Sequence, residues 1–107
     1  MQNLINDTLA KLKKISFKKN DNKNSSLSSS DIDNLRNVIM SESEILSSKI
    51  NFTKKEVNTV LLSSLLERSK ELKVMALLSD RKSKKNQNQQ FLMNIANAHE
   101  ELAIELV

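Results

Sequence analysis

Residues 51–57, NFTKKEV, mark the end of one helix and the start of another. Asn51 can take the left-handed backbone conformation that closes a helix, a position that glycine usually fills. Thr53 and Glu56 have the three-residue spacing of a capping box, and Phe52 and Val57 have the spacing of a hydrophobic staple. So short a connection predicts two helices that fold back against each other as an antiparallel hairpin.

The sequence before this turn has the periodicity of an amphipathic helix over about residues 31–50. Ser30 is a typical N-cap, and Asp31 and Asp33 place acidic groups in the first turn, where the helix dipole favours them. Ser41 and Glu44 repeat the capping-box spacing and would fit a kink near Ser41. The apolar residues that form one stripe of this helix at helical spacing are Ile32, Leu35, Val38, Ile39, Leu46 and Ile50.

The sequence after the turn predicts a long helix, about residues 53–80, that is apolar nearly all round. A helix of this kind is usually central in a bundle, or is covered in part by another chain. If it faces a protein partner, the contact residues that we expect on one of its faces are Leu61, Leu65, Leu72 and Met75.

A third core helix is predicted over about residues 88–106. It follows a polar stretch, and its apolar residues alternate at three and four positions, as in the seam of a coiled coil. Such a seam requires another helix to cover it. The seam residues are Leu92, Ile95, His99, Leu102 and Leu106.

The N-terminal part divides into a basic amphipathic helix, residues 1–18, and a polar linker, residues 19–30. The linker contains one apolar residue, Leu27, and cannot bury enough surface to offset the entropy of ordering it, so we expect it to be flexible. The apolar stripe of the helix has three alternatives: it covers the core, docks on a partner, or lies on a membrane surface. The last is the least favoured because the stripe has no tryptophan and ends in a single phenylalanine, Phe17.

Three residue types are missing from the 107 residues: glycine, proline and cysteine. Tight hairpins and phosphate-binding loops need glycine, and disulfides, zinc fingers and iron–sulfur sites need cysteine. The chain is therefore predicted to be all-α, a small helical bundle with a core over residues 31–107. It contains no apolar run long enough to span a membrane, and we expect it in the cytoplasm.

The sequence provides few groups for catalysis. Its one histidine, His99, falls in the apolar seam of the last helix, where a buried, hydrogen-bonded side chain is far more common than a general base. Glu100 and Glu101 do not make a metal site with it, because adjacent residues point to different sides of a helix. We therefore predict that the chain is not an enzyme and has no catalytic, cofactor-binding or metal-binding residues.

Charge is concentrated in two blocks. Residues 1–24 carry six lysines against two acids, and residues 67–85 carry seven basic residues against three acids. The second block could contact nucleic-acid phosphates or an acidic partner, but no aromatic residues alternate with it for base stacking. The residues expected to make that contact are Arg81, Lys82, Lys84 and Lys85.

Protein binding is the function that the sequence favours. The helices carry more apolar surface than a short chain can bury alone, which is typical of chaperones, immunity or antitoxin-type inhibitors and small regulators. The expected partner is a protein client, with a homo-oligomer also open. A nucleic-acid-associated regulator that uses residues 81–85 and the N-terminal lysines is the alternative.

Overall fold

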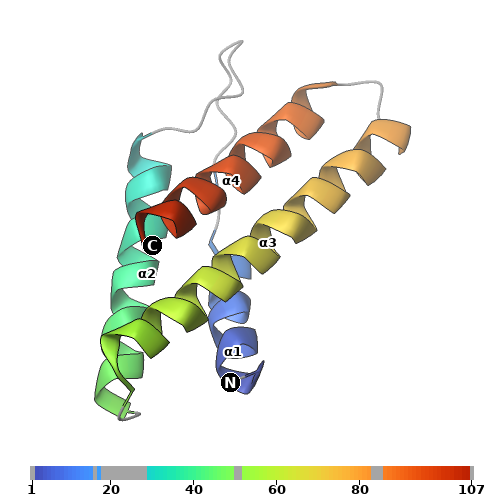
Figure 1. Ribbon diagram of the computed structural model, residues 1–107. Coiled ribbons are helices and arrows are strands. Elements are labelled where there is room, and N and C mark those ends of the chain that lie inside the picture. Colours follow the sequence, from blue (N-terminus) through green and yellow to red (C-terminus); the bar gives the residue numbers. More distant parts are fainter. Residues whose placement is uncertain (1, 16, 18–28, 50–51, 83–85, 107) are drawn as a thin grey trace.

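The computed structural model describes residues 2–15, 17, 29–49, 52–82 and 86–106. Within these ranges the chain forms four helices and no strand (Figure 1). The helices are α1 (Gln2–Lys13), α2 (Ser29–Lys49), α3 (Lys54–Lys82) and α4 (Asn86–Glu105). The predicted all-α class is confirmed.

The helix boundaries lie within two residues of those predicted for the core. α2 is one continuous helix through Ser41, so the capping-box spacing there does not interrupt it. α3 continues to Lys82 and α4 begins at Asn86, so residues 80–82 and 86–90 of the polar sequence before the last predicted helix are helical. Most of the predicted linker, up to residue 28, lies outside the described residues; its last two residues belong to α2.

The start of α3 has the capping box that its sequence predicts. The backbone N–H of Thr53 donates to Glu56 Oε1 at 3.1 Å, and the backbone N–H of Glu56 donates to Thr53 Oγ1 at 3.2 Å. Phe52 is half-buried and packs against the core cluster that contains Val57, as a hydrophobic staple requires. Asn51 lies outside the described residues.

α3 is the centre of the bundle. It packs most extensively against α4, and the two helices lie side by side and run in opposite directions (Figure 1). α1 also packs along α3, whereas α2 meets α3 near their connection and then diverges from it. The contacts are consistent with the predicted antiparallel hairpin of α2 and α3, but α3 packs more extensively against α4 than against α2.

Two clusters of buried apolar side chains form the core. The larger draws on all four helices, and the smaller joins α3 to α4 through Leu72, Ile95 and Ala96. The seam of α4 faces inward, since Ile95, His99 and Leu102 are buried. The larger cluster contains Leu12, Leu35, Ile39, Leu46, Val57, Val60, Leu61, Leu65, Ala98, Leu102 and Ala103.

α1 is seated on the bundle, which is the first of the three alternatives for its apolar stripe. Leu9 and Leu12 are buried, and the Ser64 hydroxyl of α3 lies 3.3 Å from the Ile5 carbonyl oxygen of α1. Ion pairs add to this contact: Lys11 pairs with Glu42 of α2, and Lys13 Nζ lies 3.4 Å from Glu71 Oε2 of α3. In this structure α1 therefore completes the core.

Candidate protein-binding surface

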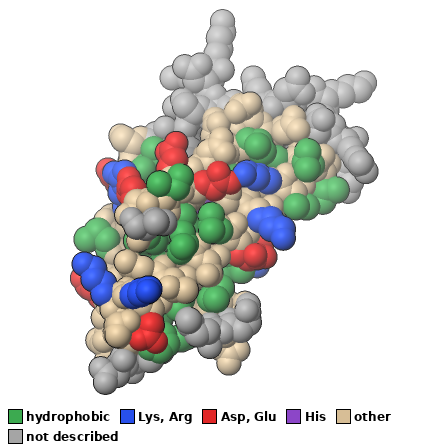
Figure 2. All heavy atoms as spheres, in the orientation of Figure 1, with side chains coloured by type: hydrophobic (Ala, Val, Ile, Leu, Met, Phe, Trp, Pro, Cys, Tyr) green, Lys and Arg blue, Asp and Glu red, His purple; other side chains and the backbone are tan. Residues whose placement is uncertain are grey.

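Large apolar side chains reach the surface from the middle of α3 to its C-terminal end. Leu66, Val74, Leu77 and Leu78 are 46, 49, 64 and 55% exposed. Their spacing of eight, three and one residues places them on one side of the helix. We call these four residues the outer stripe. Hydrophobic side chains are visible at the upper right of Figure 2, over the C-terminal end of α3 and the start of α4.

The outer stripe is exposed because it lies on a side of α3 that the neighbouring helices do not cover, and fewer helices surround α3 toward its C-terminal end. Val57, Val60, Leu61 and Leu65 lie in the cluster to which all four helices contribute. Farther along α3, Leu72 packs only in the smaller cluster with α4 residues and Phe17. A helix that is apolar all round and covered on one side must leave its other side in water.

The structure places three of the four predicted contact residues inside the protein. Leu61, Leu65 and Leu72 are buried by the chain's own helices, and Met75 is exposed beside the outer stripe. The first three are therefore not available at the surface of this fold. The sequence could not separate inward from outward faces because apolar residues occur on every side of α3.

The predicted basic cluster is described only in part. Arg81 and Lys82 belong to the last turn of α3, but their side chains are not among those described. Lys84 and Lys85 lie outside the described residues altogether. Contact of this cluster with phosphate or with an acidic partner stays a prediction.

His99 is fully buried, as its place in the seam predicts. Its Nδ1 lies 2.7 Å from the Ile95 carbonyl oxygen, which assigns the proton to Nδ1, and its ring packs at a tilt against Phe17, 6.1 Å between centroids. Nε2 has no hydrogen-bond partner among the described residues. Burial lowers the pKa of His99, and the nearby charge of Arg68 lowers it further. A neutral ring with no exposed surface is a packing residue.

Polar contacts tie the outer half of α3 to α4. Glu100 accepts a hydrogen bond from the Ser69 hydroxyl at 3.1 Å and another from Lys73. Both hydrogen bonds lower the pKa of Glu100, and the bond from Lys73 has the larger effect. These bonds join α3 to α4 on a side of α3 that is different from the side of the outer stripe.

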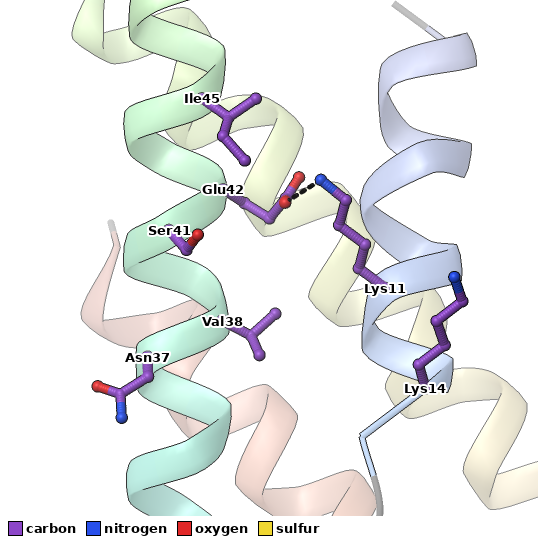
Figure 3. A pocket seen from close by; sticks show the side chains of 7 residues that line it. All are labelled: Lys11, Lys14, Asn37, Val38, Ser41, Glu42 and Ile45. Carbon is purple, nitrogen blue, oxygen red and sulfur yellow. Dashed lines mark hydrogen bonds and ion pairs between the residues drawn. The ribbon is translucent and has the colours of Figure 1, made fainter.

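A shallow groove of about 440 Å³ runs between α1 and α2 (Figure 3). Glu42 and Lys11 reach toward each other across it, and Val38 and Ile45 supply apolar lining. The docking of α1 buries the Glu42 carboxylate against Lys11. Because Glu42 pairs with Lys11, the other charged side chain in the lining is Lys14, beside the polar Asn37 and Ser41.

The described residues offer neither a metal site nor a membrane-spanning helix. Among the described residues, no three histidine, aspartate or glutamate side chains are placed to hold a metal ion. In the same part of the chain, no helix combines the length and the apolar character needed to cross a membrane. Comparisons with models of known protein families, with curated proteins and with solved structures found no match. The surface of the molecule is therefore the guide to its function.

Proposed function

We propose that this chain is a small helical protein-interaction module that holds a protein client on the outer stripe. One observation carries the proposal: α3 buries Val57, Val60, Leu61 and Leu65 in its first half and exposes Val74, Leu77 and Leu78, about half or more of each side chain, in its second. Contiguous apolar surface of this kind on a small protein is typical of a binding site.

The grouping of the outer stripe distinguishes it from other exposed apolar residues. Val74, Leu77 and Leu78 fall within about one turn of one helix, so that a partner can cover them together. Met40 and Ile104 are as exposed, at 63 and 70%, but lie on α2 and α4. Single exposed apolar residues are common on protein surfaces and need no partner.

Chaperones, inhibitors and small regulators all fit this mode of action, because each holds a helix or an apolar segment of its client. We propose that the client is met in the cytoplasm, since a chain without cysteine fits a reducing compartment. No step of the proposed function requires chemistry by the chain itself.

Site-specific photo-crosslinking in the native host tests the proposal. A benzophenone side chain is introduced in place of Leu77, and in matched proteins in place of Met40 or Ile104. We expect a discrete covalent adduct with one protein from position 77, lost when Val74→Ser is added, and none from the two control positions. The proposal fails if position 77 gives no adduct, or if all three positions give the same adducts.

A further inference from the structure

We infer that the outer stripe takes an amphipathic helix with acidic flanks from the client; this inference rests on the proposed function. From Leu66 to Leu78 the stripe spans twelve residues of α3, or about 18 Å of helix length. A convex helix side presented to a partner is covered well by a second helix whose apolar residues recur at three and four positions.

Positive charge around the outer stripe favours acidic residues on both sides of the apolar face of that helix. Lys70 is exposed and lies four residues from both Leu66 and Val74, and no ion pair within the described part of the chain neutralises it. Arg81 and Lys82 follow in the last turn of α3. Over residues 67–82 the helix carries five basic and three acidic residues.

One of the three acidic residues is already neutralised. Glu71 is paired with Arg68 at 3.3 Å and with Lys13 of α1 at 3.4 Å. Glu67 is the exposed acid at the N-terminal end of the stripe. Lys73 is paired with Glu100 of α4, and the third acid of the segment is Asp80. The remaining residues of the segment are then three basic, Lys70, Arg81 and Lys82, and two acidic, Glu67 and Asp80. This net positive charge at the rim favours an acidic partner over a basic one.

Other occupants fit less well. A second copy would bring a helix with the same net positive charge against the stripe, and like charges at an interface disfavour association. Residues 18–28 of this chain contain Leu27 as their only apolar residue, so they cannot cover four large apolar side chains.

Binding of two synthetic peptides to the full chain tests the inference. Both have about 18 residues and leucines at three- and four-residue spacing; one has glutamate and its twin has lysine on the flanks. We expect the acidic peptide to bind at least about ten times more tightly, and its affinity to fall with added salt.

Variants locate the contact. Val74→Ser with Leu77→Ser should weaken binding of the acidic peptide roughly 30-fold or more, because the apolar contact is central. Lys70→Glu should weaken it roughly three- to tenfold. Two controls should leave it unchanged: Met40→Ser, an exposed apolar residue elsewhere, and Lys55→Glu, the same charge change about 22 Å away along α3.

Several results would overturn the inference. The inference fails if the two peptides bind equally well or if neither binds. It also fails if the chain binds vesicles that contain phosphatidylglycerol but does not bind the acidic peptide. A dimer that Leu77→Ser dissociates in sedimentation equilibrium would assign the stripe to a second copy. If crosslinking at position 77 succeeds while the peptides show no charge preference, the proposed function stands and this inference fails. If crosslinking fails as well, both fail.

Discussion

The two halves of α3 resemble each other in sequence and differ in their surroundings. Leu61 and Leu65 in the first half are buried among side chains of all four helices, whereas Leu77 and Leu78 in the second half face water. A stretch of apolar residues does not by itself say how many of them are buried. The sides of the helix that neighbouring helices cover decide this, and α3 extends beyond two of its three neighbours.

This difference separates the residues that stabilise the fold from those that are free to bind. Burial of a leucine side chain stabilises a protein by about 1.5–3 kcal/mol. The first half of α3 therefore contributes to stability through several side chains. Of the described apolar side chains in the second half, only Leu72 and Ala76 are buried, and the large exposed ones contribute little in the unbound protein.

Truncation of one leucine in each half should give the largest contrast. We expect Leu65→Ala to lower the free energy of unfolding by about 2–5 kcal/mol, because it leaves a cavity in the core. Leu77→Ala should change it by less than about 0.5 kcal/mol. Urea unfolding followed by circular dichroism measures both. Equal losses would show that the second half is covered in solution.

The pH dependence of stability should report on His99, whose pKa is lowered by burial and also by the charge of Arg68 in the middle of α3. Burial lowers the pKa of His99 below 6.5 in the folded protein, so the unfolded chain binds the proton first. Its contribution to stability is complete above pH 6.5 and is lost progressively as the pH falls below that value. Unfolding at pH 7.5 and 5.5 measures this loss, which His99→Gln should reduce. An unchanged slope in that variant would contradict the assignment.

Removal of the N-terminal cap of α3 should lower the stability of the protein less than the core truncation Leu65→Ala does. Thr53→Ala deletes the hydroxyl that accepts the Glu56 backbone N–H, and we expect a loss of about 1 kcal/mol. Thr53→Ser keeps the hydroxyl and should restore most of the stability. Thermal unfolding measures both variants, and identical midpoints for the two would mean that the cap does not stabilise α3.

Loss of a surface ion pair in the second half should have the smallest effect. Lys73 and Glu100 are each more than one third exposed, so Lys73→Ala should cost no more than about 0.5 kcal/mol. Hydrogen bonds to Lys73 and Ser69 lower the pKa of Glu100 below 4.5, so its contribution is present above pH 4.5 and is lost as the pH falls below it. Urea unfolding at pH 7 and 3.5 measures it, and a loss as large as that of Leu65→Ala would contradict this ranking.

Local sequence signals predicted the elements of the fold well. The capping box at Thr53 and Glu56 and the seam of α4 depend on residues a few positions apart, and both are present in the structure. Burial of His99 followed from the same seam. These features could be predicted because neighbours along one helix set them.

Features that depend on contacts between helices could not be predicted in this way. Leu61 and Leu77 are the same residue type on the same helix, and only the positions of α1, α2 and α4 make one buried and the other exposed. The burial of Glu42 likewise depends on Lys11, 31 residues away in the chain. The outer stripe thus became visible only once the helices were placed together.

Amide hydrogen exchange along α3, without and with the acidic peptide, tests the division of this helix most directly. In the free protein, amides of residues 57–66 should exchange only through global unfolding, and those of residues 74–78 should exchange faster. Added peptide should slow exchange at residues 74–78 and leave α1 unchanged. Slower exchange at residues 57–65 together with faster exchange in α1 would contradict the account, because the partner would then displace α1 and bind the face of Leu61 and Leu65.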